Sequence, residues 1–155
     1  MNKKLLNLAI NAFICAIYVV LTLVNPLGYG PIQFRYSEII AVIPFFNRKY
    51  IPGVVLGVFL ANLFGPLGLV DVFVGVFICV VSYTISYYVK NAYINAVIYS
   101  ILCGIFVSLE LYFVVKAPFI ITSASIFVGQ IVVTLIGVTL LKSVDKRINL
   151  SASLV

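Results

Sequence analysis

Four ionisable side chains could bind a charged ligand in a chain in which only 9% of residues are charged: Arg35, Glu38, Asp71 and Glu110. Each lies in or beside an apolar stretch, where an ionised side chain at mid-membrane costs ~2.5 to 3.5 kcal/mol unless it is paired or functional. Arg35 and Glu38 are three residues apart and are neighbours on one face if a helix begins by Gln33. The spacing fits either a self-satisfied pair at a membrane interface or a pair that presents charge to a ligand.

Glu110 has leucines on both sides and no cation within one helical turn in the sequence. An unpaired glutamate in such a place is expected to be protonated, and its partner must come from another helix or from a ligand. Asp71 follows a Gly-Pro-Leu-Gly turn at 65–68, so we expect it to be an N-cap, with a site role as the alternative. Asn62 and Gln130 can each hydrogen-bond to another helix.

The sequence lacks the residue patterns that are typical of metal, cofactor and nucleotide sites. The chain has no histidine, no CxxC pair and no GxxxxGK[ST] phosphate loop, so we expect no metal site, no cofactor and no nucleotide binding in this chain. The three cysteines, Cys15, Cys79 and Cys103, fall in long apolar stretches and are interpreted as buried apolar residues. Any ATP-driven activity would need another chain.

The elements that position these residues must lie in a bilayer, because 64% of the 155 residues are hydrophobic and the mean hydropathy is +1.24. We expect one all-α domain over 1–155, a single compact bundle of six transmembrane helices in the cell membrane. Lys3 and Lys4 precede the first apolar stretch, which is too long for a signal peptide. The expected helices are 5–24, 33–46, 50–69, 72–89, 92–115 and 119–141.

The distribution of lysine and arginine favours six crossings, with the short second helix spanning. In that topology eight cations share one side, and only Arg35 and Lys116 lie on the other. If the second helix did not span, three of these cations would lie on one side of the membrane and seven on the other. Short loops rich in lysine and arginine are cytoplasmic, so both termini are predicted to be cytoplasmic and Arg35, Glu38 and Asp71 to lie toward the outer face.

Small residues recur every four positions at Gly53, Gly57, Ala61 and Gly65, and a shorter version occurs at Ala12 and Ala16. This spacing lets two helix backbones approach closely, which we interpret as packing inside the bundle.

Together, Arg35, Glu38 and Glu110 in the outer half, with Asn62 and Gln33 in reach, describe an apolar pocket with a few convergent polar groups. Such a pocket is typical of a small-molecule site, but these residues do not name the ligand.

The first half of the chain resembles the QueT family, the membrane-embedded substrate-binding (S) components of energy-coupling-factor (ECF) transporters for queuosine precursors. The resemblance is carried by Gly30-Pro-Ile-Gln-Phe-Arg35 with Ser37-Glu38, then Pro44-Phe-Phe46, Ile51-Pro-Gly53, Ala61-Asn-Leu-Phe-Gly65 and Gly68-Leu-Val-Asp71. Beyond Val89 it rests on hydropathy and length alone.

The resemblance implies a six-helix protein that captures a micronutrient at its outer face and docks on a transmembrane coupling protein with two ATPases. It implies that Ala12 and Ala16, which match the alanine-x-x-x-alanine face of such proteins, contact the coupling protein. It also implies a 7-deazaguanine substrate such as preQ0, preQ1 or queuine. Glu38 or Glu110 could accept hydrogen bonds from the guanine edge, Arg35 or Asn62 could donate to the carbonyl, and Phe34 or Tyr36 could stack on the base.

Three alternatives remain open from the sequence. The chain could be an S component for another vitamin, such as riboflavin, biotin or pantothenate. It could be a membrane-integral enzyme that uses Glu38, Asp71 or Glu110 as acid or base, although it lacks a nucleophile-base pair. A small channel is disfavoured because too few polar residues are present to line a wet pore.

Overall fold

The computed structural model describes residues 2–148, and every regular element in that range is helical. Four helices are long and apolar enough to cross a membrane: α1 (Lys3–Leu23), α4 (Leu69–Tyr88), α5 (Ala92–Val115) and α6 (Phe119–Ile148). The shorter elements are α2 (Glu38–Ala41), α3 (Ile51–Leu63) and the 3-10 turns η1 (Ile43–Phe45) and η2 (Arg48–Tyr50). The all-α architecture is therefore confirmed, while six membrane crossings stay a prediction.

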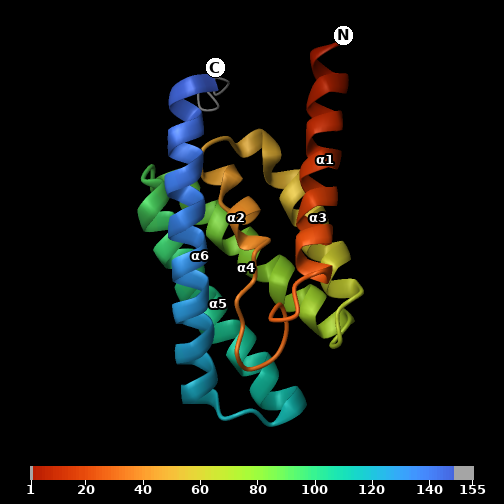
Figure 1. The fold of residues 1–155 in the computed structure, drawn as a ribbon, viewed down its shortest axis with the longest axis vertical. Helices are drawn as coiled ribbons and strands as arrows, with labels where there is room; N and C mark the ends of the chain where they lie inside the picture. Colours follow the sequence, from red (N-terminus) through yellow and green to blue (C-terminus); the bar gives the residue numbers. More distant parts are fainter. Residues whose placement is uncertain (1, 149–155) are drawn as a thin grey trace.

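The helices form a ring in which each element packs on the next. Contacts run from α1 to α3, then to α4, α5 and α6. The short α2 contacts both α6 and α1 and so closes the ring between these two long helices (Figure 1). The start of α1 and the end of α6 lie at one end of the bundle, and the turn between α5 and α6 lies at the other (Figure 1).

The glycine face of α3 packs inside this ring, against α1. A methyl group on Gly53 would come within 2.6 Å of the Asn11 carbonyl oxygen, and one on Gly57 within 2.9 Å of the Tyr18 Cβ. Small residues at this spacing are therefore used for close contact between two helices of the same chain.

The expected helix over 33–46 is wrong. Residues 24–37 contain no helix, and only α2 and η1 follow before Phe46. Gly30 has a φ of +101°, a left-handed conformation that other residues rarely adopt, and Pro31 and Pro44 cannot donate a backbone hydrogen bond. The apolar character of this stretch reflects burial inside the bundle, with Ala41 and Val42 fully buried.

The expected helix over 50–69 is too long. Helix α3 ends at Leu63, before Gly65 and Pro66, and its 13 residues extend about 20 Å, less than the ~30 Å of a hydrocarbon core. Helix α4 then begins at Leu69 with Gly68 as its N-cap. Asp71 lies within the first turn, so its predicted capping role is wrong, although a carboxylate there is still favoured by the helix dipole.

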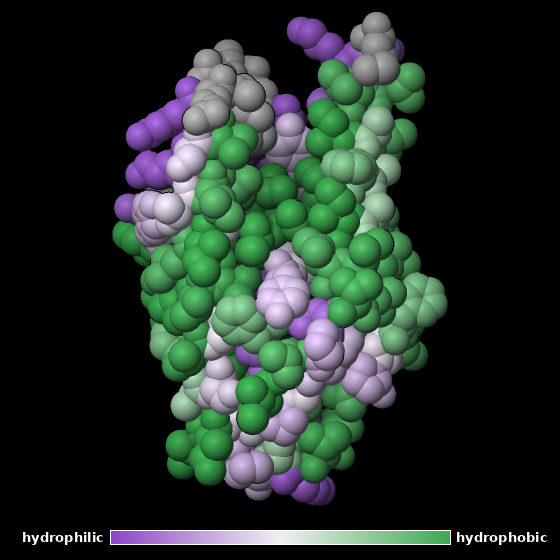
Figure 2. All heavy atoms as spheres, viewed as in Figure 1, coloured by the Kyte–Doolittle hydropathy of each residue, from purple (hydrophilic) through white to green (hydrophobic). Residues whose placement is uncertain are grey.

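On the face drawn in Figure 2, strongly hydrophilic side chains lie at the two ends, further polar side chains form a strip through its centre and lower part, and apolar side chains cover most of the rest. The cations Lys3, Lys4, Arg48, Lys49, Lys90, Lys142 and Lys146 belong to helix ends or connections at the end where α1 starts, and Lys116 lies at the opposite end. These seven cations share one end, as expected from the sequence, whereas Arg35, expected toward the opposite face, is buried inside the bundle. Which side of the membrane each end faces stays a prediction.

Candidate functional site

Arg35 connects three parts of the chain. It is buried, its Nε donates to the Gly28 carbonyl oxygen at 2.8 Å, and its Nη2 donates to Asn62 Oδ1 at 2.9 Å. Nη2 also lies 3.6 Å from an oxygen of Asp71, and the guanidinium stacks over the Tyr29 ring at 5.0 Å. The planar fork of arginine suits these simultaneous contacts, so the charge is compensated inside the protein.

Glu38 opens α2 at the centre of the bundle and is almost fully buried. Tyr18 of α1 donates its hydroxyl to Oε1 at 3.0 Å, and Tyr99 of α5 donates to Oε2 at 2.8 Å. The nearest guanidinium nitrogen of Arg35 is 4.0 Å away. The two residues therefore interact, but the main partners of Glu38 are two tyrosines from distant helices.

The segment before α2 is fixed by its own side chains. Asn25 Nδ2 donates to the Phe34 carbonyl oxygen at 2.6 Å, while Asn25 Oδ1 accepts from the Leu27 backbone N–H at 3.0 Å. The Thr22 hydroxyl donates to Ser37 Oγ at 2.7 Å. These bonds satisfy polar backbone that would otherwise be costly to bury, and they hold residues 25–34 against the bundle.

A cavity of about 390 Å³ lies beside this segment, near the turn that joins α5 and α6. Its walls are mainly apolar, and its polar side chains come from the segment before α2, from α4 and from α5. The lining residues are Tyr29, Gly30, Pro31, Gln33, Pro66, Leu67, Asp71, Val107, Glu110, Leu111, Val115, Ala117 and Pro118. Small-molecule sites combine such an apolar wall with a few placed polar groups.

Two carboxylates, Asp71 and Glu110, face this cavity, and they differ in their surroundings. Asp71 is held near Arg35, and its backbone carbonyl oxygen accepts from Asn62 Nδ2 at 2.9 Å. Glu110 is 5% exposed, and neither of its carboxyl oxygens has a hydrogen-bond partner among residues 2–148. An unpartnered buried carboxyl group is costly, so Glu110 marks the position where a ligand can supply donors or positive charge.

The structure separates the residues predicted from the sequence into two groups. Gln33, Asp71 and Glu110 line the cavity, whereas Arg35, Asn62 and Glu38 lie behind its wall and are bonded to protein. Arg35, Asn62 and Glu38 therefore hold neighbouring residues in place and do not face the cavity. The roles of all these residues in binding stay predictions.

Phe34 and Tyr36 do not line the cavity. Their rings pack edge to face at 5.8 Å, and Tyr36 is 42% exposed. The ring on the cavity wall is Tyr29, whose hydroxyl donates to the Ala61 carbonyl oxygen at 2.9 Å. Tyr18, Tyr29 and Tyr99 are not among the residues predicted for the site from the sequence, because the position of a tyrosine in an apolar stretch does not show whether its hydroxyl has a buried acceptor.

Ala12 and Ala16 lie on the exposed face of α1, together with Phe13, which is 66% exposed. The packing of α1 on α3 uses the other face, which carries Asn11 and Tyr18. The alanines are therefore available for contact with lipid or with another chain.

Apolar helices of membrane-spanning length, with the lysines at the two ends of the bundle, define a multi-pass protein of the cell membrane. The profile of the QueT transporter family matches residues 8–146, and the chain belongs to this family. The family predicted by resemblance is thus confirmed, and the match extends well past Val89.

A curated relative from Lactococcus lactis subsp. cremoris (strain MG1363), named Queuosine precursor transporter QueT, is 32% identical to this chain. The similarity covers 97% of this chain and 98% of the relative. A comparison with solved structures gave no significant match.

Proposed function

We propose that this protein captures a queuosine precursor of the 7-deazaguanine class and mediates its uptake across the cell membrane. Membership of the QueT transporter family and the name of the Lactococcus lactis relative support this substrate class. The observation that carries the proposal is the pair of carboxylates, Asp71 and Glu110, on the wall of a 390 Å³ cavity in which Glu110 has no partner among the described residues.

The guanine-like edge of the substrate matches Asp71 and Gln33. That edge offers N1–H and an exocyclic amine, two donors that one carboxylate can accept together. Asp71 is suited to this role because Arg35 and the end of α3 hold it in place. The Gln33 side-chain amide, which has no hydrogen-bond partner in residues 2–148, can donate to the carbonyl oxygen of the base, and the Tyr29 ring provides apolar contact.

Glu110 is suited to the positively charged part of the substrate. The Arg35 charge is already shared between Asp71 and Glu38, so Glu110 is left as an uncompensated acidic group beside the cavity. The protonated amines of preQ1 and queuine would compensate it, whereas preQ0 carries a neutral nitrile. We therefore expect tighter binding of preQ1 than of preQ0.

Titration of the purified protein with preQ1 and preQ0 tests the proposal. Losing one member of a buried charge pair costs ~2 to 5 kcal/mol, so Glu110→Gln should weaken preQ1 binding about 30-fold or more and should reduce the preference over preQ0. Asp71→Asn should weaken both ligands. Tyr112→Phe is the control, because this side chain is two residues further along α5, does not line the cavity and is 47% exposed.

Absence of binding by every 7-deazaguanine would reject the substrate class. Riboflavin, biotin and pantothenate belong in the same titration, because saturable binding of one of them would favour an S component for a different vitamin. Chemical conversion of a bound ligand by the protein alone would favour the enzyme alternative.

Energy for uptake would come from partner subunits, a transmembrane coupling protein with two ABC-type ATPases, and the protein itself would act as a binding subunit and not as an enzyme. Helix α1 supports this part of the proposal, because it is the least covered of the four long helices. Only 22% of the residues in its apolar stretch are buried, against 39% to 44% in the other three. Ala12 and Ala16 would let the coupling protein approach closely on this exposed face.

Co-purification of the tagged protein with its two ATPases tests the partner proposal. Ala12→Leu with Ala16→Leu should reduce recovery of the ATPases while leaving ligand binding by the isolated protein unchanged. Val128→Leu on the exposed face of α6 is the control for added bulk. If the ATPases are recovered equally with the double alanine variant and with Val128→Leu, the docking face lies elsewhere on the protein.

A further inference from the structure

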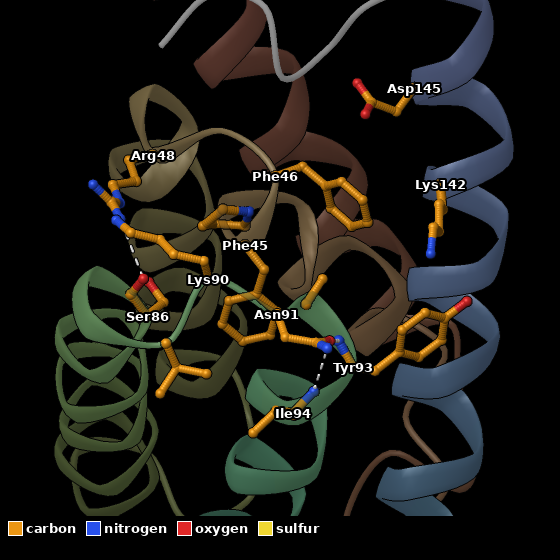
Figure 3. Close-up of a pocket in the computed structure, with 13 residues that line it drawn as sticks. Phe45, Phe46, Arg48, Ser86, Lys90, Asn91, Tyr93, Ile94, Lys142 and Asp145 are labelled. Atoms are coloured by element: carbon orange, nitrogen blue, oxygen red, sulfur yellow. Dashed lines mark hydrogen bonds between the residues drawn. The ribbon is translucent and has the colours of Figure 1, made fainter.

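A second and larger cavity, of about 960 Å³, lies at the opposite end of the bundle, near the start of α5 and the last turns of α6 (Figure 3). It is separate from the cavity that contains Glu110 and shares no lining residue with it. Its charged lining residues are Arg48, Lys90, Lys142 and Asp145, so three cations face one acid. The cavity therefore favours an anion, and its charge is opposite to what a cationic precursor requires.

The three cations come from different elements and surround the space. Arg48 belongs to η2, Lys90 to the α4–α5 connection and Lys142 to α6. In Figure 3, Arg48 and Lys90 lie on one side of the cavity and Lys142 on the other. This arrangement requires the folded bundle, since the three residues are far apart in the sequence.

Contacts with the protein hold two of these cations without neutralising them. Arg48 donates to the Ser86 carbonyl oxygen at 3.2 Å and stacks over the Tyr87 ring at 4.0 Å. The Lys142 ammonium lies 5.2 Å from the centre of the Tyr93 ring. Lys90 and Lys142 form no ion pair within residues 2–148. Positive charge thus remains available in the cavity.

The rest of the lining is amphipathic. Phe45, Phe46, Val89 and Ile94 provide apolar wall beside the cations. Ile94 is 50% exposed, and Tyr88, which precedes the lining residue Val89 in the chain, is 84% exposed, so the apolar wall adjoins exposed aromatic surface. An aromatic residue at the end of a membrane-length helix lies at headgroup level, so the cavity opens where lipid phosphates lie and the adjoining surface can accept an acyl chain.

We propose that this cavity binds the phosphate headgroup of an anionic phospholipid. Basic pockets between membrane helices are suited to such headgroups because the phosphate gains several cationic partners at the depth where it already resides. The occupant differs from a soluble anion because the apolar wall and the adjoining exposed surface add contacts that only a lipid can use. Bound lipid would join η2, the α4–α5 connection and α6 through one ligand.

Native mass spectrometry of the detergent-purified full chain tests this proposal, with phosphatidylglycerol and phosphatidylcholine as probes. We expect phosphatidylglycerol to be retained at lower concentration than phosphatidylcholine. Lys90→Gln and Lys142→Gln should each weaken its retention about fivefold, and the double variant roughly 25-fold if the effects add. Lys4→Gln is the matched control, since it removes the same charge from the same end but does not line the cavity.

Three outcomes would overturn the proposal. Equal retention of the two lipids would show that the headgroup charge is not recognised, and an equal loss in Lys4→Gln and the cavity variants would show that the general charge of this end is responsible. Full displacement of the lipid by millimolar glycerol phosphate would show a site for soluble anions. Binding of preQ1, measured in parallel, should be unchanged in all three single variants, so folding is monitored independently of the lipid.

Discussion

Gly129 of α6 lies against the Gln33 backbone so closely that a methyl group at this position would overlap the Gln33 carbonyl oxygen. The contact places a residue of the cavity wall directly on a long helix. Because Gln33 is in a segment without helical hydrogen bonds, this contact is one of the features that fix its position.

Gly129→Ala should therefore displace Gln33 and weaken ligand binding. Overpacking of this kind also costs ~1 to 3 kcal/mol of stability. Ligand titration and thermal unfolding in detergent measure the two effects. Val128→Ala is the control, because its side chain is 59% exposed and does not line the cavity. Wild-type affinity in Gly129→Ala would mean that Gln33 does not need this helix for its placement.

The tyrosines that donate to Glu38 should be needed for stability. Tyr18→Phe and Tyr99→Phe each leave one buried carboxylate oxygen without its donor, which costs ~1 to 3 kcal/mol. Thermal unfolding should show lower stability for each variant, and the double variant should deviate from additivity because the two donors bond to the two oxygens of one carboxylate group. Tyr88→Phe, on an exposed tyrosine, should unfold like the wild type.

Arginine should be specifically required at position 35. Lysine keeps the charge but has no planar fork, so it cannot reproduce the bonds to Gly28 and Asn62 together. Arg35→Lys should lower stability by ~1 to 3 kcal/mol and weaken ligand binding, because Asp71 loses the group that holds it. Lys116→Arg tests the reverse exchange at an exposed residue and should have no effect. Full activity of Arg35→Lys would mean that charge alone is sufficient.

The orientation predicted from the charge distribution can be measured by labelling in intact cells. Lys116→Cys should react with a membrane-impermeant maleimide, whereas Ser143→Cys should react only after the cells are opened. Both positions are exposed, and the native cysteines, Cys15, Cys79 and Cys103, are buried and should give little background. If Ser143→Cys reacts in intact cells and Lys116→Cys does not, the topology is the inverse of the predicted one.

Hydropathy predicted the long helices well because their length is imposed by the membrane. The expected range 92–115 coincides with α5, and α1 differs from its expected range by one or two residues at each end. Helix α6 extends seven residues beyond the expected 141, since a helix can continue past the apolar region. The ranges 33–46 and 50–69 failed because apolar composition does not distinguish a spanning helix from a buried irregular segment broken by proline and glycine.

The candidate site could be predicted only in part, because the sequence shows which residues are acidic but not which of them are already paired in the folded protein. Glu110 stood out because an unpaired acid in an apolar helix is unusual, and it does line the cavity. Glu38 stood out because it is three residues from Arg35, yet its main partners are tyrosines 20 and 61 residues away in the sequence. Only the packing of α1 and α5 around α2 reveals that its carboxylate is already satisfied.

The hydrogen bonds of Asn25, Arg35 and Tyr29 have a consequence for the thermodynamics of ligand capture. They fix the cavity wall formed by residues 28–33 without any ligand. Little backbone or side-chain freedom is left to lose when a ligand arrives, so the entropic penalty of association falls mainly on the ligand itself. A rigid receptor of this kind can bind a small, flat molecule tightly even though the molecule offers few contacts.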